Sequence, residues 1–284
     1  MILIKNLINN HMIISRTPFR ISFVGGGSDL QSYYKHNGGA VLSSSINKYI
    51  YQTYHKYFHN KSIIKYSSTE IVDEIKNIKH PIIQNVFKRF NITKADYTSI
   101  ADIPSGTGLG SSSSFTVGLI KLASEITNTQ MNNLDIAKMA CDIEIIDLAE
   151  PIGKQDQYAA ALGGINEIIF NKDGKVEINP IKINLENIQQ LKNNFFLCYT
   201  GIKRSASSVL TKQNDLMKKE NKRRVLDNLV SLVRDLKNEL EIGRVDEMGS
   251  ILKEGWELKK SITQSISNNE IDLLYEFGIN SGAT

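Results

Sequence analysis

Three glycines at alternate positions, Gly106, Gly108 and Gly110, lie just before a run of four serines, residues 111–114. Glycine adopts positive φ without steric cost, and it lets backbone N–H groups approach a ligand closely. Unpaired N–H groups and the positive end of a helix dipole both favour an anion at the start of a helix. The stretch that begins at Pro104 therefore predicts a loop that binds the phosphate groups of a nucleotide.

The neighbouring segments are those that such a loop requires. Alternating residues over 97–103 predict a strand before the loop, and an apolar segment over 115–126 predicts a helix after it. A flexible glycine-serine linker, the alternative interpretation, has no reason to lie between a strand and a helix. Two common phosphate loops are excluded, because the P-loop needs a lysine after Gly110 and the dinucleotide fingerprint needs a glycine where Ser111 stands.

A second glycine run, residues 25–27, precedes Ser28 and Asp29 at the end of an alternating segment over 13–24. Backbone without side chains lets a ligand hydroxyl approach, and a carboxylate accepts its hydrogen bond. The alternative is structural, because Ser28 or Asp29 at the start of a helical segment over 30–35 is suited to capping that helix. The residues alone leave both interpretations open.

Acidic residues follow the serine-rich loop. Glu144 lies in an amphipathic segment that predicts one helix over 134–149, where a glutamate is usually solvated unless a neighbour needs its charge. Residues 151–164 predict a turn and then a helix of small residues, with Asp156 at its start. An isolated aspartate there is an ordinary cap, but its place between glycines and beside a strand over 165–170 makes it a candidate pocket residue.

The composition is that of a soluble globular protein: 284 residues, 41% hydrophobic, 23% charged, with a net charge of +4. The densest basic segment, 218–224, lacks interleaved aromatic residues, so we expect a solvated helix face and no nucleic-acid partner. The sequence has no run that predicts a membrane span, and residues 1–11 lack the pattern of a signal peptide, so we expect a cytoplasmic protein with no membrane partner. Cys141 and Cys198 have no metal-ligand spacing and are expected in the core.

The rest of the pattern predicts the order of elements. Asp173-Gly174 predicts a hairpin turn, and the apolar segment 195–200 predicts a strand. Beyond Gly201 the chain is expected to be mostly helical, over 205–218, 222–241, 245–260 and 268–277. A change of composition at Asn179-Pro180 predicts a domain boundary at residue 180.

These residues resemble the motifs of the GHMP kinases, the family of galactokinase, homoserine kinase, mevalonate kinase and phosphomevalonate kinase. Residues 104–112 are similar to its Pro-x-x-x-Gly-Leu-Gly-Ser-Ser motif, and residues 153–156 resemble the segment with the catalytic aspartate. Residues 16–29 are similar to the first motif, with Arg20 and Asp29 matching, but Phe19 and the glycines at 26–27 depart from it.

The resemblance implies an α+β fold of two domains. The N-terminal domain, over 12–180, would resemble domain 2 of ribosomal protein S5 and hold the nucleotide and the sugar. The C-terminal domain, over 181–284, would be ferredoxin-like. The family also has a third glycine-rich motif near its C-terminus, and this sequence reaches residues 281–284 where that motif would begin. We therefore expect an incomplete C-terminal domain. The sequence predicts no oligomeric state.

The resemblance also implies roles for the matching residues. ATP would be bound by the loop, at Pro104, Gly106, Gly108, Leu109, Gly110, Ser111, Ser112 and Ser113. Mg²⁺ would be held by Ser112, favoured over Ser111, and by Glu144. Asp156 would accept the proton of the attacking hydroxyl, and Arg20 would steady the negative charge there. The sugar would be contacted by Gly26, Gly27, Ser28 and Asp29.

The triple glycine and residues 153–157 are most similar to the branch of the family that phosphorylates the anomeric hydroxyl of D-glycero-D-manno-heptose 7-phosphate. A sugar that already carries a phosphate needs a second cationic site. Lys203 and Arg204 are candidates for it, and they fit a surface role at a helix start equally well. The alternatives are a kinase for another sugar, such as fucose or galactose, and a sugar-binding regulator of the same fold without catalysis.

Overall fold

The structure is a computed structural model that describes residues 12–202, 220–263 and 266–284. These residues form two compact units. The first unit comprises residues 12–19, Ile46–Glu150 and Asp156–Gly163. The second unit comprises Arg20–Ser45, Pro151–Gln155 and the described residues from Gly164 onward. The domain boundary at residue 180, expected from the change of composition there, stays a prediction.

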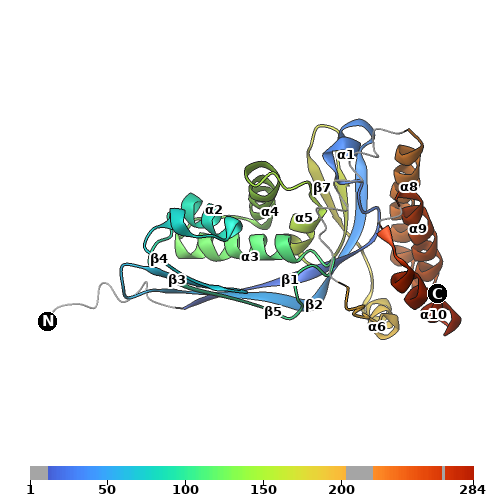
Figure 1. The fold of residues 1–284 in the computed structure, drawn as a ribbon. Coiled ribbons are helices and arrows are strands. Elements are labelled where there is room, and N and C mark those ends of the chain that lie inside the picture. The colour runs from blue at the N-terminus through green and yellow to red at the C-terminus, as the bar shows by residue number, and fades with distance from the viewer. Residues whose placement is uncertain (1–11, 203–219, 264–265) are drawn as a thin grey trace. The chain divides into compact units, whose positions relative to one another are not determined.

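In the described part of the chain, strands and helices are interspersed up to residue 180, and only helical elements follow (Figure 1). The strands are β1 (Ile13–Val24), β2 (Gly39–Lys56), β3 (Ser62–Lys65), β4 (Thr69–Val72), β5 (Ala95–Ala101), β6 (Ile165–Phe170) and β7 (Val176–Pro180). The α-helices are α1 (Gln31–Asn37), α2 (Pro81–Phe90), α3 (Ser111–Ile126), α4 (Asn133–Cys141), α5 (Gln155–Leu162), α6 (Leu185–Asn194), α8 (Glu220–Ile242), α9 (Met248–Ile262) and α10 (Asn269–Asn280). The other helical turns are η1 (Ile75–Asn77), η2 (Asp142–Asp147) and η3 (Val245–Glu247).

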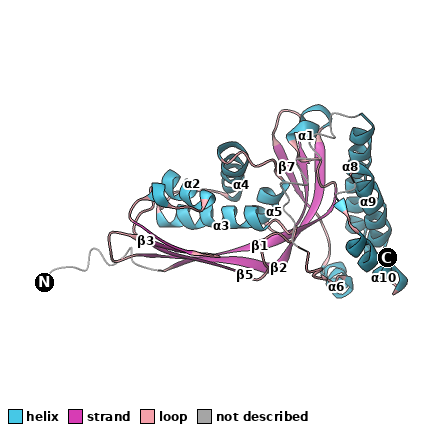
Figure 2. Cartoon of the chain, in the orientation of Figure 1, coloured by secondary structure: helices cyan, strands magenta, loops and turns pink. Residues whose placement is uncertain are grey.

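The first unit is a sheet with helices on one face (Figure 2). The C-terminal part of β2 pairs antiparallel with β5, β5 pairs parallel with β3, and β3 pairs antiparallel with β4. Helices α2 and α3 lie over this sheet, and their side chains share a core with it that includes the fully buried Ile64, Phe87 and Leu119. Each such apolar side chain stabilises the fold by about 1.5–3 kcal/mol relative to an exposed one.

Helix α3 approaches the sheet closely because residue 118 is glycine. A Cβ at Gly118 would lie 2.5 Å from Thr17 Oγ1. The first turn of α3 is also tied to the strands, because Ser114 Oγ donates to the Pro18 carbonyl at 2.9 Å and Gln52 Nε2 donates to the Phe115 carbonyl at 2.8 Å. The sheet thus fixes the position of the helix N-terminus that follows the glycine-serine loop.

The second unit combines strands with a helix pair. The N-terminal part of β2 pairs antiparallel with β6, and β6 pairs with β7. Lys175 N–H donates to the Asp173 carboxylate at 2.9 Å, which confirms the predicted hairpin turn. Leu229, Val233 and Leu236 lie on one face of α8 at helical spacing and are buried in the core of this unit together with residues of α9.

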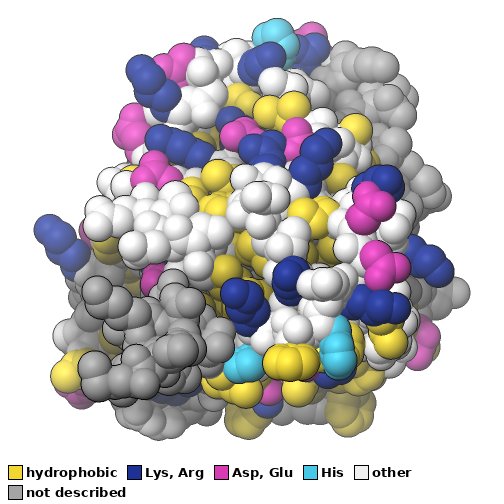
Figure 3. Space-filling model, turned by 90° about the vertical axis from the view of Figure 1, so that its left-hand side faces the viewer, with side chains coloured by type: hydrophobic (Ala, Val, Ile, Leu, Met, Phe, Trp, Pro, Cys, Tyr) yellow, Lys and Arg dark blue, Asp and Glu magenta, His cyan; other side chains and the backbone are white. Residues whose placement is uncertain are grey.

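Charged side chains are dispersed on the surface. On the face shown in Figure 3, lysine and arginine side chains lie among acidic and uncharged ones. Ion pairs between neighbours include Lys121 with Glu125 at 2.7 Å and Lys65 with Asp96 at 2.9 Å. Among the helices of the described ranges, we find none with both the length and the apolarity to cross a membrane.

Two expectations about the segment after α6 are wrong. The apolar residues 195–200 form no strand, and Phe196 and Leu197 are 85% and 60% exposed. No described strand pairs with this segment. An apolar segment forms a β-strand only when a neighbouring strand pairs with its backbone N–H and C=O groups. Cys198 is consequently exposed, whereas Cys141 is buried as expected.

Candidate active site

The glycine-serine loop connects β5 to α3, as the sequence predicts. Gly106, Gly108 and Gly110 all have positive φ, at 79°, 77° and 74°, which confirms the conformation expected of them. Gly110 is the N-cap of α3, and the helix begins at Ser111. The first N–H groups of a helix have no partner within it, so this end of α3 is suited to an anion.

The side chain of Glu144 is buried beside the first turn of α3, with 1% of its surface exposed. Ser112 Oγ donates to Glu144 Oε1 at 2.6 Å, and Ser113 Oγ donates to Oε2 at 2.8 Å. Gln157 Nε2, from α5, also donates to Oε2, at 2.7 Å. These four residues, the Glu144 cluster, link the loop serines to the two helical segments that follow them in the chain.

A π-helix carries Glu144. The sequence predicts one helix over 134–149, but α4 ends at Cys141 and the next residues, Asp142–Asp147, form the π-helix η2. Short π-helical turns are rare and occur frequently at functional sites. Because a π-turn changes the phase of residues around the helix axis, α-helical periodicity does not give the direction of Glu144. Glu144 does not have the solvated position that is usual for a helix-face glutamate, since its carboxylate is buried and three donors satisfy it.

Burial raises the pKa of Glu144 above its ordinary value. Hydrogen bonds from Ser112, Ser113 and Gln157 act in the opposite direction, and the negative charge of Asp156 raises the pKa further. The dominant effect is the cost of keeping a negative charge away from water. A cation bound beside this carboxylate would reduce that cost.

The donor set of the Glu144 cluster fits Mg²⁺. This ion prefers oxygen ligands and usually combines one or two carboxylates with several waters and phosphate oxygens. The cluster offers the Glu144 carboxylate, the Ser112 hydroxyl and the Gln157 side-chain oxygen, which is buried without a hydrogen-bond partner in the described chain. Within the described ranges, no three His, Cys, Asp or Glu side chains group together as metal ligands.

A second buried carboxylate, Asp29, lies in the second unit and is 2% exposed. Its Oδ1 accepts hydrogen bonds from the Gly27 N–H at 3.1 Å and from Gln155 Nε2 at 2.9 Å. Its Oδ2 accepts the Gln155 N–H at 3.1 Å. Ser22 Oγ donates to Gln155 Oε1 at 2.7 Å, which fixes the orientation of the amide. With Gly153, these residues form the Asp29 cluster.

Helix capping does not explain the residues after the triple glycine. The N-cap of α1 is Leu30, and no side chain caps this helix. Ser28 Oγ instead donates to the Ala40 carbonyl at 2.9 Å and accepts the Ala40 N–H at 3.1 Å, so it holds the glycine loop against β2. Asp29 is left with its acceptor atoms directed at residues 27 and 155.

Close backbone approach explains Gly153. A Cβ there would lie 1.8 Å from Asp29 Oδ2 and 3.0 Å from the Asp29 carbonyl carbon, so any larger residue would displace the carboxylate. The segment after the turn at residues 151–153 and the segment after the triple glycine therefore pack directly together. The sequence marks both segments as candidate site elements, and the structure brings them into contact.

The structure places the other predicted site residues as follows. Arg20 lies in β1 and in the second unit, partly buried, and Asp156 lies in the first turn of α5 and in the first unit. Thr107 Oγ1 donates to the Pro104 carbonyl at 3.3 Å within the phosphate loop. Lys203 and Arg204 lie outside the described residues.

Sequence reasoning missed the side chains that orient both carboxylates. Gln155 and Gln157 flank Asp156, and each donates a side-chain hydrogen bond to a different buried carboxylate. The available signal was their position: amide side chains on both sides of a candidate catalytic aspartate, just after a Pro/Gly turn. Their partners, 126 and 13 positions away in the sequence, carried no such signal.

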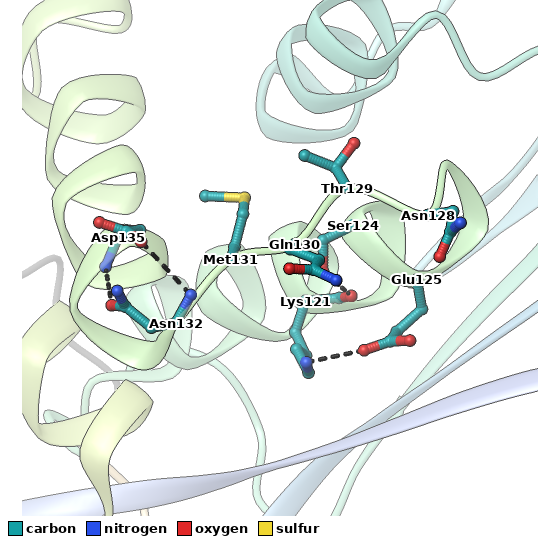
Figure 4. A pocket seen from close by; sticks show the side chains of 9 residues that line it. All are labelled: Lys121, Ser124, Glu125, Asn128, Thr129, Gln130, Met131, Asn132 and Asp135. Carbon is teal, nitrogen blue, oxygen red and sulfur yellow. Dashed lines mark hydrogen bonds and ion pairs between the residues drawn. The ribbon is translucent and has the colours of Figure 1, made fainter.

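A hollow of about 510 Å³ lies elsewhere in the first unit, where α3 ends and α4 begins (Figure 4). Its polar groups are largely paired with one another. Lys121 bonds Glu125, while Asn132 and Asp135 form a capping box at the start of α4. None of the candidate site residues lines this hollow, so we assign it to the helix connection.

Comparison with known proteins places these sites in a family context. The chain matches the GHMP kinases N terminal domain over residues 76–164, which include the loop, Glu144 and Asp156. It is 31% identical to the D-glycero-alpha-D-manno-heptose 7-phosphate kinase of Campylobacter jejuni, with 95% of this chain and 84% of that protein covered. It is 25% identical to the bifunctional fucokinase/GDP-fucose pyrophosphorylase of Arabidopsis thaliana, over 92% of this chain and 27% of that protein.

The crystal structure of a D-glycero-D-manno-heptose 1-phosphate kinase from Bacteroides thetaiotaomicron has a similar fold, with a TM-score of 0.73 and 27% sequence identity. The likeness covers 88% of this chain and 79% of that one. The shared fold agrees with the α+β, two-domain architecture that the motifs imply. Since the sequence similarity runs along nearly the whole chain and includes the phosphate loop, the chain belongs to the GHMP kinase family.

Proposed function

We propose that this GHMP kinase transfers the γ-phosphoryl group of ATP to the anomeric hydroxyl of D-glycero-D-manno-heptose 7-phosphate, giving the 1,7-bisphosphate. The chain is an ATP-dependent sugar kinase by its family. The choice of substrate is supported by the 31% identity to a heptose 7-phosphate kinase along 95% of the chain. The bisphosphate would be a precursor for nucleotide-activated heptose.

The observation that carries the proposal is the buried Glu144 carboxylate, hydrogen-bonded by two serines at the helix end that follows the phosphate loop. Phosphoryl transfer leaves little covalent chemistry for the protein, so catalysis consists of positioning and charge neutralisation. A pre-positioned carboxylate and hydroxyl beside a helix N-terminus supply both requirements. A simple sugar-binding protein has no need for a buried negative charge there.

In this proposal Ser112 and Glu144 hold Mg²⁺ together with the nucleotide. Bound Mg²⁺ would neutralise the negative charge of the β- and γ-phosphate oxygens. Gln157 keeps the Glu144 carboxylate oriented through its amide N–H. The buried side-chain oxygen of Gln157 has no hydrogen-bond partner in the described chain and would be available as a further acceptor. The glycines at positions 106, 108 and 110 give the backbone N–H groups their approach to the phosphates.

Asp156 acts as the general base and accepts the proton of the sugar hydroxyl as its oxygen attacks the γ-phosphorus, while ADP leaves. Arg20 steadies the negative charge of the transferred group. In the second unit, Gly26, Gly27, Ser28 and Asp29 provide the sugar-binding segment, in which the Asp29 carboxylate accepts hydrogen bonds from sugar hydroxyls. Gln155, which donates a hydrogen bond to Asp29, directly precedes Asp156 in the sequence.

A second candidate is a kinase for a sugar without a phosphate, such as fucose. The 25% identity to the plant fucokinase protein over 92% of this chain favours it as the alternative. A purely regulatory, non-catalytic protein is disfavoured by the intact Asp156 and by the organised Glu144 cluster.

The test is release of ADP from ATP and Mg²⁺ with a panel of acceptors: heptose 7-phosphate, unphosphorylated heptose, fucose and galactose. Heptose 7-phosphate should give the highest kcat/KM, and Asp156→Asn should abolish the sugar-dependent signal. A reaction without sugar controls for ATP hydrolysis. Equal or faster turnover of fucose would favour the alternative, and the absence of any sugar-dependent signal would overturn the proposal.

A further inference from the structure

A pocket of about 420 Å³ lies in the second unit, beside the triple glycine. One wall is the end of β1 and the glycine loop, and the other walls are provided by α8 and α9. Its lining includes Ser22, Gly26, Leu229, Gly255, Trp256 and Lys259. The volume is in the range of small-molecule sites. Nothing in the sequence motifs assigns a role to the α9 residues.

Lys259 brings its positive charge to the glycine loop. Its Nζ lies 3.0 Å from the point that a Cβ at Gly26 would occupy. Gly26 does not have positive φ, so glycine is needed at this position for space and not for backbone conformation. The absence of a side chain leaves room for the ammonium group, or for a ligand atom next to it.

The position that a Cβ at Gly26 would occupy also lies next to the Asp29 cluster. The side-chain nitrogen and oxygen of Gln155 each lie 3.9 Å from it, and the Gln155 amide donates to Asp29. The ammonium of Lys259 and the amide that orients Asp29 therefore face one small space from different sides. A ligand held there can contact the sugar-binding carboxylate with hydroxyl groups and Lys259 with an anionic group.

The other walls make an anion more favourable there. Leu229, Leu252 and Gly255 make part of the lining apolar, and a charge interaction beside apolar groups is weakened less than one surrounded by water. The indole Nε1 of Trp256 is buried with no hydrogen-bond partner in the described part of the chain. A buried N–H without an acceptor costs stability, so binding that turns the indole N–H toward a ligand oxygen would relieve that cost.

We propose that this pocket binds the phosphate that the acceptor sugar already carries, with Lys259 as its cationic contact. This inference rests on the proposed function, because it assumes a sugar phosphate as the acceptor. It gives a specificity-determining residue for phosphorylated over unphosphorylated sugars. Lys259 lies on α9, far in sequence from all the motif residues, which explains why the pattern of glycines and acids does not reveal it.

The kinetic test compares heptose 7-phosphate with unphosphorylated heptose in four proteins: wild type, Lys259→Met, Lys259→Arg and Lys253→Met. Lys259→Met should lower kcat/KM for the sugar phosphate roughly 10- to 100-fold, as expected for one charge-assisted hydrogen bond. Turnover of unphosphorylated heptose should change little. Lys259→Arg should restore part of the preference, and Lys253→Met, an exposed position on the same helix with the same charge change, should behave like wild type.

A binding measurement without catalysis provides the second readout. The chain contains one tryptophan, so its fluorescence reports on Trp256 in this pocket. Titration with heptose 7-phosphate should change the emission of wild type at lower concentrations than titration with heptose. Lys259→Met should remove this difference. Gly26→Ala, which takes the space next to the ammonium, should weaken the response to the sugar phosphate.

The outcomes separate the two proposals. If wild type prefers the sugar phosphate and Lys259→Met keeps that preference in both measurements, the pocket assignment is overturned and the proposed function stands. If wild type shows no preference for the phosphorylated sugar, the proposed substrate is overturned and the pocket assignment with it. Loss of the preference in Lys259→Met, with heptose turnover retained, shows that the variant is folded and supports the assignment.

Discussion

Each of the two units contains one deeply buried carboxylate among the candidate site residues, Glu144 in the first and Asp29 in the second, and different donors surround the two. Glu144 in the first unit is bonded by two hydroxyls and one amide, all from side chains. Asp29 in the second unit is bonded by two backbone N–H groups and one amide, and Gly153 packs against it without a side chain. Side-chain donors can rotate toward a new partner, whereas backbone donors keep their direction.

In the proposed function, this difference corresponds to two chemical tasks. A carboxylate that exchanges its donors for a metal ion and phosphates needs partners that can move, and a bound cation would offset the cost of burying the charge, which is what raises the pKa of Glu144. A carboxylate that selects a sugar by its hydroxyl geometry needs a fixed orientation. We infer that the Glu144 cluster changes its contacts on binding, while the Asp29 cluster is organised in advance.

The largest effect is expected at Asp156, next to the Glu144 cluster. Asp156→Asn should lower kcat by roughly two to four powers of ten, because the group that accepts the hydroxyl proton is lost. Affinity for ADP, measured by calorimetry, should change little. Asp173→Asn, in the β6–β7 turn, is a matched control with the same chemical change. Near-normal kcat for Asp156→Asn would remove this residue from the role of base.

A smaller but still large effect, on KM for the sugar, is expected when the Asp29 carboxylate is displaced. Gly153→Ala places a Cβ against Asp29 Oδ2 and should raise KM for the sugar roughly 10- to 100-fold through loss of a charged hydrogen bond. The Mg²⁺ concentration for half-activity should not change. Gly278→Ala is the control, since a Cβ there meets its nearest atom at 4.0 Å. An altered Mg²⁺ requirement in Gly153→Ala would contradict separate tasks for the two carboxylates.

Variants of the Glu144 cluster should show the opposite pattern, with a changed Mg²⁺ requirement and an unchanged KM for the sugar. Ser112→Ala and Glu144→Ala should raise the Mg²⁺ concentration needed for half-activity, by roughly 2- to 10-fold for the serine, because a metal ligand is removed from a site with few. KM for the sugar should stay close to that of wild type. Activity titrations with Mg²⁺ at saturating sugar measure both quantities. A Ser112→Ala variant that titrates like wild type would return this hydroxyl to a structural role.

The smallest effect is a change in the pH dependence of stability. Because the pKa of Glu144 is raised in the folded state, the native protein keeps a proton that the unfolded chain has already lost. The free energy of unfolding should therefore fall as pH rises from the ordinary glutamate pKa through the raised one. Urea unfolding without Mg²⁺ should show this decline in wild type and less of it in Glu144→Gln. Parallel curves for the two proteins would contradict the raised pKa.

The sequence predicts the local backbone conformation of the phosphate loop well. Positive φ at Gly106, Gly108 and Gly110 follows from the residue type and from the strand and helix on either side. The hairpin turn at Asp173 follows from a similarly local preference. These features need no information about distant segments.

Features that depend on distant partners were not predictable in the same way. The burial of Glu144 depends on a π-helix and on donors from α3 and α5, so the pattern along one helix left its burial open. Asp29 meets Gln155 across 126 sequence positions. The segment 195–200 has the composition of a strand, but composition does not supply a strand to pair with.

The proposed phosphoryl transfer is tested most directly by phosphorus NMR of a reaction of this protein with ATP, Mg²⁺ and heptose 7-phosphate. We expect loss of the ATP γ-phosphate signal, appearance of ADP, and one new phosphate signal coupled to the anomeric proton, with the 7-phosphate signal retained. Release of inorganic phosphate alone, or a new phosphate coupled to a position other than the anomeric one, would contradict the proposed transfer.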